Sequence, residues 1–118
     1  FALMGSIYAQ RVLGIDRPRL ALLANGEEET KGNAAVQAAH EALRRMTLNF
    51  VGNVEAKDLL QGAADVVVSD GFVGNVAIKT AEGCSHSTHD YDIVFFFHFF
   101  TSQSVKVTIY MNKSHARC

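Results

Sequence analysis

The sequence predicts an α/β fold in which helices are layered on a parallel sheet. Three short runs of apolar residues have the length of strands, and segments with helical spacing alternate with them. A polar or glycine-containing loop follows each run. Strands that are covered on both faces give such continuous apolar runs, and alternation with helices is typical of parallel strands. The 118 residues fit one small domain.

The pattern begins with a helix, a strand and a loop. Gly14 is placed to end the first helix, and "LALLA" at 20–24 is the first predicted strand. The loop "NGEEETKGN" at 25–33 follows it. Apolar residues at helical spacing give the first helix one apolar face, namely Phe1, Leu3, Met4, Ile7, Tyr8, Val12 and Leu13.

Two more strands and two more helices follow. Arg44 and Arg45 lie near the end of the second helix, where the helix dipole favours cations. That helix is predicted from the apolar stripe Val36, Ala39, Leu43 and Met46. The later segments are a strand at 48–52, a loop with a short helix at 53–63, a strand at 65–69 and a helix from Asn75 to Glu82.

The loops after the three predicted strands begin "NGEEETKG", "GNVEAKD" and "SDGFVGN". If the strands are parallel, these loops gather along one edge of the sheet. Ligands of such sheets bind outside the carboxyl ends of the strands. We therefore expect one site that uses all three loops.

The third loop has the features of an anion site. Gly71 and Gly74 permit positive φ and close approach, and a helix that starts near Asn75 would present backbone N–H groups to a phosphate or an oxyanion. The spacing is neither that of a Walker loop nor GxGxxG. An ordinary turn between strand and helix explains the two glycines equally well.

Charged residues beside these loops allow two interpretations each. Lys79 shares a helix face with Asn75, so it either reaches the same anion or pairs with Glu82. Asp70 either orients a donor or caps the turn. The carboxylates around Glu28 form a solvated loop or orient Lys31. A metal site there is disfavoured because no histidine accompanies them.

Composition changes abruptly near residue 84. All nine glycines lie at or before Gly83, whereas five of the eight phenylalanines and four of the five histidines follow it. A single domain normally mixes these residues throughout. We therefore treat 1–83 as a partial α/β domain and 84–118 as a tail of different origin, as expected from a shifted reading frame, an unspliced segment or an assembly error. We also expect the chain to be a fragment, because its first residue is Phe1.

The tail has its own pattern. "DIVFFFHFF" at 92–100 is too short to span a bilayer as a helix, which needs about 20 residues, and it reads as a strand that is buried or prone to aggregate. "VKVTIY" at 105–110 alternates and is suited to pair with it. Side chains of metal-ligand type cluster nearby, but no second pair completes a zinc pattern: Cys84, His86, His89 and Asp90.

Net charge, cysteine spacing and the absence of a signal segment argue against several classes of protein. A net charge of -1 gives no reason to expect nucleic acid. The two cysteines lack the spacing of a disulfide framework or a zinc site. No segment reads as a secretion signal, which favours the cytosol.

The stretches "IYAQRVLGIDRPRLALLANGEEETKGN" and "LNFVGNVEAKDLLQGAADVVVSDGFVGNVAIKTAEG" resemble the middle of the bacterial phosphate acyltransferases of the PlsX type. The resemblance covers residues 1–83. It implies an enzyme that transfers a fatty acyl group from acyl carrier protein to inorganic phosphate for phospholipid synthesis, without cofactor or metal. It also implies a Rossmann-like three-layer α/β/α sandwich of the isopropylmalate dehydrogenase type, and a cytoplasmic homodimer that can associate peripherally with the membrane.

The implied acyl transfer to phosphate suggests a role for residues in each of the three loops. Phosphate would be neutralised by backbone N–H groups at 71–75 with Lys79 or Lys31, and Glu28 would lie in the substrate site. Asn53 and Asn75 would stabilise the thioester oxyanion. Asp70 would repel phosphate, so it would orient a loop donor or a pantetheine amide.

Two alternatives stay open. Family members are several times longer than 83 residues, so the sheet is expected to be incomplete, and the chain would then be an inactive truncated fragment. A nucleotide-binding α/β module that uses "DGFVGN" is the other alternative, although its spacing fits neither nucleotide motif.

Overall fold

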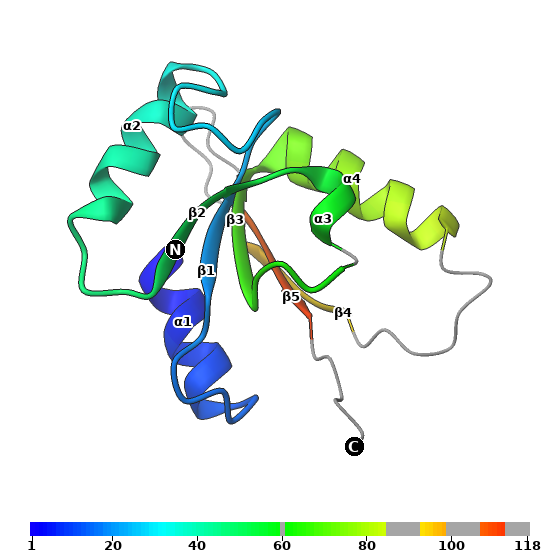
Figure 1. Ribbon diagram of the computed structural model, residues 1–118. Coiled ribbons are helices and arrows are strands. Elements are labelled where there is room, and N and C mark those ends of the chain that lie inside the picture. Colours follow the sequence, from blue (N-terminus) through cyan, green and yellow to red (C-terminus); the bar gives the residue numbers. More distant parts are fainter. Residues whose placement is uncertain (60, 85–92, 99–106, 113–118) are drawn as a thin grey trace.

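The computed structural model describes residues 1–59, 61–84, 93–98 and 107–112, which form one five-stranded sheet with helices packed on it (Figure 1). The strand order is β2-β1-β3-β5-β4. The elements are α1 (Ala2–Arg11), β1 (Leu20–Leu23), α2 (Ala34–Arg44), β2 (Phe50–Val54), α3 (Ala56–Leu59), β3 (Val66–Asp70), α4 (Gly71–Cys84), β4 (Ile93–His98) and β5 (Val107–Asn112).

The three strands predicted to be parallel are parallel. β1 pairs with β2 on one side, where Leu22 lies opposite Asn53, and with β3 on the other, where Leu22 lies opposite Val68. All three strands therefore end at the same edge of the sheet. The prediction of an α/β fold with a parallel sheet is confirmed, and the arrangement is compatible with a Rossmann-like domain.

Alternate residues of the central strands face opposite layers of helices. Leu20, Leu22 and Val66 pack in one core cluster with residues of α1 and α2. Ala21 and Val67 belong to a second cluster with Leu59 of α3, and Ala77 of α4 packs against it. Side chains on both faces of β1 and β3 are thus buried, which explains why these segments read as unbroken apolar runs.

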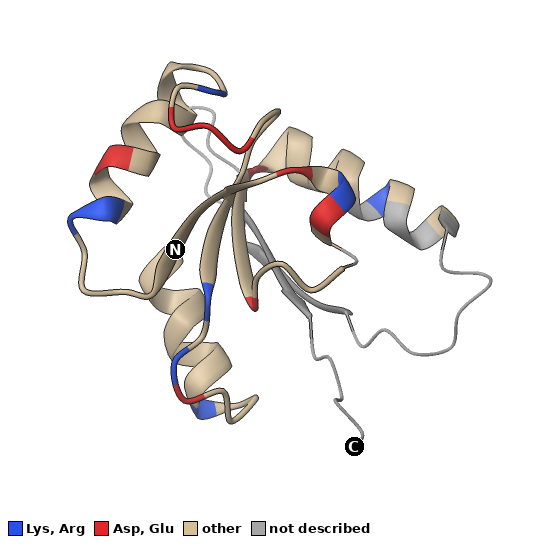
Figure 2. Ribbon diagram, in the orientation of Figure 1, with Lys and Arg blue, Asp and Glu red and all other residues tan. Residues whose placement is uncertain are grey.

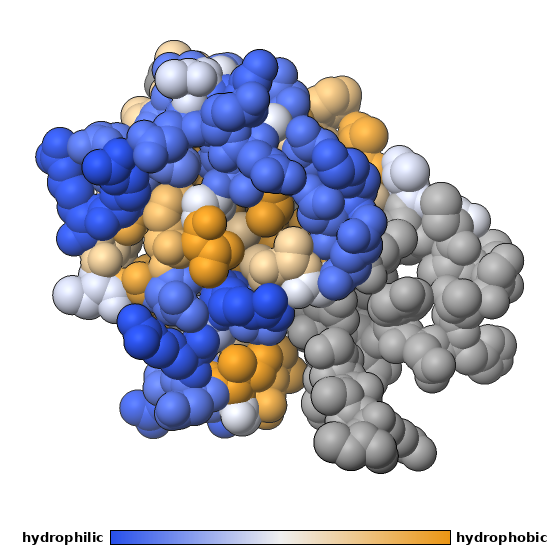
Figure 3. All heavy atoms as spheres, in the orientation of Figure 1, coloured by the Kyte–Doolittle hydropathy of each residue, from blue (hydrophilic) through white to orange (hydrophobic). Residues whose placement is uncertain are grey.

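The first helix packs through its small residues. Ala2, Gly5, Ser6 and Ala9 are buried, and their spacing of three, four and seven residues places them on one face. The larger apolar residues of the predicted stripe, such as Met4 and Ile7, are about half exposed. Figure 3 shows apolar side chains gathered near the middle of the visible face and again in the region of α1. The predicted helix is confirmed, but most of its larger apolar residues point outward.

Two predicted boundaries are displaced. β2 begins two residues after the predicted strand, so Asn53 lies within the strand and not in the loop that follows. α4 begins at Gly71 instead of near Asn75. Gly71 and Gly74 are buried helical residues without positive φ, so the turn that both interpretations placed here is wrong. The reason is that Asp70 caps the helix directly after β3.

The described part of the tail extends the sheet. β4 and β5 pair with each other, as predicted, and their orientation is antiparallel, with Phe96 opposite Ile109. β5 also pairs antiparallel with β3, so that Val68 lies opposite Ile109. The sheet consequently contains both parallel and antiparallel pairs, with β4 as one edge strand and β2 as the other. Of the suggested metal ligands, Cys84 ends α4, and His86, His89 and Asp90 lie outside the described residues.

Arg19 and Asp65 join the segments that enter β1 and β3. The Arg19 guanidinium donates two hydrogen bonds to the Asp65 carboxylate, at 3.1 and 3.0 Å, and the Arg19 backbone N–H donates a third at 2.8 Å. Burial alone would raise the pKa of the Asp65 carboxyl. The hydrogen bonds and the charge of Arg19 outweigh burial and hold this pKa below its ordinary value.

This lowered pKa predicts an acid-sensitive contribution to stability. The carboxylate form stabilises the fold above the ordinary aspartate pKa of about 3.9, and the contribution is lost as the pH falls through the lower pKa of the folded state. We expect the chain to exceed its Asp65→Asn variant in melting temperature at pH 6, with the difference shrinking below about pH 4. A difference that stays constant from pH 6 to pH 3 in thermal denaturation would contradict this.

None of the helices in the part of the chain that the structure describes has both the length and the apolar character of a membrane-spanning segment.

Candidate functional site

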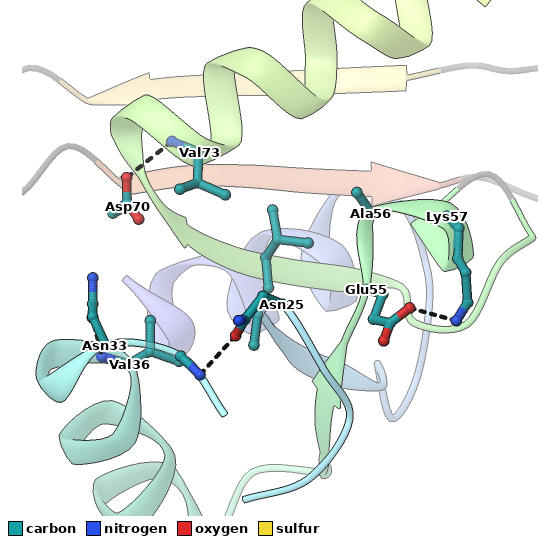
Figure 4. Close-up of a pocket in the computed structure, with 11 residues that line it drawn as sticks. Asn25, Asn33, Val36, Glu55, Ala56, Lys57, Asp70 and Val73 are labelled. Carbon is teal, nitrogen blue, oxygen red and sulfur yellow. Dashed lines mark hydrogen bonds and ion pairs between the residues drawn. The ribbon is translucent and has the colours of Figure 1, made fainter. Parts of the chain in front are cut away.

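A pocket of about 530 Å³ lies at the carboxyl edge of β1, β2 and β3 (Figure 4). Its lining comes from the loop after β1, the segment after β2, and the junction of β3 with α4. Leu23, Ala24, Val36, Ala56 and Val73 make up its apolar lining. The polar groups are Asn25, Asn33, Glu55, Lys57 and Asp70. The three strand-end loops that were predicted to share one site thus contribute to one pocket.

The loop between β1 and α2 is closed by two asparagines and a glycine. The Asn25 Oδ1 accepts a hydrogen bond from the Gly32 backbone N–H at 2.8 Å, which joins the two ends of the loop. Asn33 is the N-cap of α2, and its Oδ1 accepts from the Val36 N–H at 3.0 Å. Gly32 has a φ of 90° and lies close to Val36, where no side chain fits.

A buried chain of hydrogen bonds holds the loop between β1 and α2 in place. Asn53, at the end of β2, donates from Nδ2 to the Glu28 carbonyl at 2.9 Å. Its Oδ1 lies 2.9 Å from Nδ1 of His40, a buried residue of α2. The His40 ring packs edge-on against Phe50, with a centroid distance of 5.1 Å. Asn53 thus holds the loop in place, and its buried amide does not line the pocket.

The hydrogen-bond chain also determines the protonation of His40 at Nδ1. The Glu28 carbonyl can only accept, so the nitrogen of the Asn53 amide must face it and the oxygen must face His40. Since Oδ1 is an acceptor, His40 carries a proton on Nδ1. Sequence analysis did not identify this residue. A single histidine in an apolar helix stripe gives no signal for such a role until β2 is placed beside it.

We predict that His40→Phe loosens the loop. Phenylalanine keeps a ring against Phe50 but leaves the Asn53 Oδ1 without its donor, at a cost of about 1–3 kcal/mol. The backbone N–H groups of Lys31 and Gly32 donate within the loop, so their hydrogen exchange should accelerate. His40→Asn, which keeps a donor near the Nδ1 position, is the matched control. Equal exchange rates in the native chain and His40→Phe would contradict the proposed support.

Asp70 caps α4 and lines the pocket at the same time. Its Oδ1 accepts from the backbone N–H groups of Phe72 and Val73, both at 3.0 Å. Of the two roles considered for Asp70, capping is therefore confirmed. Because a carboxylate already occupies these N–H groups, the start of α4 does not present them to a phosphate. The same contact disfavours a nucleotide phosphate at "DGFVGN".

Lys57 is the cation that lines the pocket, and it was not singled out from the sequence. Its ammonium group forms a hydrogen bond and ion pair with Glu55. The hydrogen bond to Glu55, together with nearby carboxylates, raises the pKa of Lys57 above its ordinary value. Figure 2 shows acidic and basic residues interspersed along this edge, in the loop after β1 and around α3.

The other predicted site residues lie around the pocket instead of lining it. Glu28 and Lys31 fold over Gly26: a Cβ there would lie 2.6 Å from Lys31 Cγ and 2.8 Å from Glu28 Oε2. The backbone N–H of Lys31 also donates to the Glu28 carbonyl at 2.9 Å. Asn75 and Lys79 are exposed on α4, beyond the turn that carries Val73. Their catalytic roles stay predictions.

Asn25 and Asn33 were also missed as pocket residues. The signal was present in part, because an asparagine before a helical stripe is a typical N-cap. The described residues hold no group of three or more histidine, cysteine, aspartate or glutamate side chains arranged to bind a metal ion.

Comparison with known proteins identifies a family that this chain matches. The family model described as "Fatty acid synthesis protein" matches residues 1–90. A phosphate acyltransferase of Geobacillus sp. (strain WCH70) is 59% identical over 87 residues, which are 74% of this chain and 26% of the relative. A phosphate acyltransferase of Anaeromyxobacter sp. (strain Fw109-5) is 56% identical over 91 residues, 77% of this chain and 25% of the relative.

A third phosphate acyltransferase, from Lactococcus lactis subsp. cremoris (strain SK11), is 57% identical over 84 residues, 70% of this chain and 25% of the relative. The chain thus spans about a quarter of the length of the curated relatives that it matches.

Proposed function

Because the chain belongs to the family of fatty acid synthesis proteins, we propose that it carries part of the site of a phosphate acyltransferase. In the proposed reaction, a fatty acyl group moves from the thioester of acyl carrier protein to inorganic phosphate. The acyl phosphate would then serve phospholipid synthesis. Acyl carrier protein and phosphate are accordingly the proposed substrates.

The proposed step needs positioning more than it needs a strong base. An oxygen of hydrogen phosphate attacks the thioester carbonyl carbon, the new C–O bond forms and the C–S bond breaks. The proton of hydrogen phosphate ends on the departing sulfur, giving acyl phosphate and the free thiol. Phosphate is already an anion near neutral pH, so the site must bring two reactants together and balance charge.

The observation that carries the proposal is the meeting of three strand-end loops at one pocket. This is the edge at which parallel α/β sheets bind ligands. Two lysines supply positive charge there: Lys57 lines the pocket, and Lys31 adjoins the pocket residue Gly32. We propose Lys31, with Lys79 on α4, as the cations that balance a phosphate bound beside the pocket.

The proposed partners and location follow the same chemistry. We propose a cytoplasmic enzyme, because its substrates would be carrier protein and phosphate, with peripheral contact to the membrane that receives the product. We also propose a homodimer for the full-length family member.

The test is an assay of the purified chain with acyl carrier protein loaded with a fatty acid. Free thiol should appear only when inorganic phosphate is present, and phosphate labelled with ³²P should be incorporated into acyl phosphate. Thiol release without phosphate would indicate hydrolysis and contradict the proposal. Absence of thiol release would favour a fragment without catalysis, an alternative supported by the quarter-length match.

Asn75 gives a further prediction. If its amide donates to the developing oxyanion, Asn75→Ala should lower turnover by about 10- to 1000-fold. The measurement is kcat in a full-length relative that carries the equivalent change. Since Asn75 is exposed and does not line the pocket, folding should be unaffected, as circular dichroism would verify. An unchanged kcat would remove Asn75 from the site.

A further inference from the structure

We propose that the pocket binds a neutral chain that contains secondary amides, of the pantetheine class, through Asn25, Asn33 and Asp70. The inference rests on the proposed function, in which such an arm carries the acyl group. It assigns the pocket to the arm, so that phosphate binds beside the pocket and not within it.

The amide groups of Asn25 and Asn33 have fixed orientations. Backbone N–H groups can only donate, so the atoms that accept from Gly32 and Val36 must be the side-chain oxygens. Each NH₂ group is thereby turned away from the backbone that holds its oxygen. Both residues line the pocket, and Figure 4 shows Asn33 rising from the start of α2 on the side where Asp70 lies. The pocket therefore gains two neutral donors whose direction is set before any ligand arrives.

Asp70 supplies the complementary acceptor. Its Oδ1 accepts both N–H groups of α4, and this contact orients the carboxylate. Oδ2 is then placed to accept from a ligand in the pocket. A secondary amide has one carbonyl, which suits an asparagine NH₂, and one N–H, which suits a carboxylate. Pantetheine contains two such amides and no charge.

Charge and surface also favour a neutral ligand over phosphate. The lining holds two carboxylates, Glu55 and Asp70, against one ammonium, Lys57. That ammonium is already paired with Glu55. A dianion would therefore meet net negative charge, whereas five apolar residues offer contact to the methylene and methyl groups of a pantetheine arm. The volume of about 530 Å³ lies within the range of small-molecule sites, roughly 300–1,000 Å³.

The test uses the full chain labelled with ¹⁵N. The side-chain NH₂ signals of Asn25 and Asn33 are assigned by their loss in Asn25→Asp and Asn33→Ser, each of which keeps the oxygen that accepts from the backbone. Pantetheine is then titrated in one sample and inorganic phosphate in another. We expect both NH₂ signals to shift saturably with pantetheine and to stay in place with phosphate. Asn33→Ser should weaken pantetheine binding about three- to tenfold, the loss of one hydrogen bond.

Two results would overturn the inference: NH₂ signals that respond to phosphate instead of pantetheine, or signals that respond to neither. The acyl-transfer assay separates this outcome from failure of the proposed function. A chain that binds pantetheine but forms no acyl phosphate would refute catalysis and keep the arm site. A chain that forms acyl phosphate at the same KM for the acylated carrier protein in Asn33→Ser would refute only the arm site.

Discussion

Replacing Gly32 by alanine is expected to destabilise the folded chain by about 2–4 kcal/mol and to displace the loop that lines the pocket. Two costs combine. Gly32 has a φ of 90°, which side chains rarely adopt, and an added Cβ would lie 2.5 Å from Val36 Cγ1 and 2.7 Å from Val36 Cβ. Val36 is itself a pocket residue in the first turn of α2. Urea denaturation would measure the change.

Gly14 provides the matched control. It also has positive φ, at 70°, but an added Cβ there meets no atom within 4 Å. Gly14→Ala should therefore show the conformational cost alone, about 1–2 kcal/mol. Equal effects of the two substitutions would mean that contact with Val36 does not matter. Pantetheine binding should fall in Gly32→Ala and remain unchanged in Gly14→Ala.

Leu20→Ala is expected to lower the free energy of unfolding by about 2–5 kcal/mol, a large share of the roughly 5–15 kcal/mol of a typical domain. Leu20 is fully buried in the interior strand β1, between the neighbours β2 and β3. Its removal leaves a cavity under α1 and α2 that the rigid sheet cannot close. Denaturant unfolding gives the value directly.

Leu3→Ala is the control for the orientation of α1. Leu3 is 49% exposed, because the helix packs through its small residues. The substitution should change stability by less than about 1 kcal/mol. A loss comparable with that of Leu20→Ala would show that the apolar stripe, and not the small-residue face, packs on the sheet in solution.

The sequence predicted an element correctly where burial alone determined its pattern of apolar residues. Apolar runs at 20–24 and 65–69 predicted β1 and β3 because both faces of these strands are buried. Parallel pairing then placed the three loops at one edge. For α1 two periodic patterns overlap: small residues at 2, 5, 6 and 9 share a face just as the larger apolar residues do. Periodicity alone does not determine which face packs on the sheet.

The start of α4 was mispredicted for a different reason. Glycine has a low helix propensity, so Gly71 and Gly74 indicated a turn. In the structure Asp70 caps the helix at its first residue, and both glycines are buried. The roles of His40 and Asn53 depend on the contact between α2 and β2, which are separated in sequence by a loop, and no local pattern reveals it. The same holds for the orientation of Asn25 and Asn33, which is set by backbone donors in the folded loop.

Formation of acyl phosphate by the purified chain tests the central claim most directly. Acylated carrier protein is incubated with and without inorganic phosphate labelled with ³²P, and the labelled acyl phosphate and the free thiol are measured together. We predict equal amounts of both products with phosphate and neither without it. Thiol release that is independent of phosphate, or none under either condition, would contradict the claim that the three loops form a site of acyl transfer to phosphate.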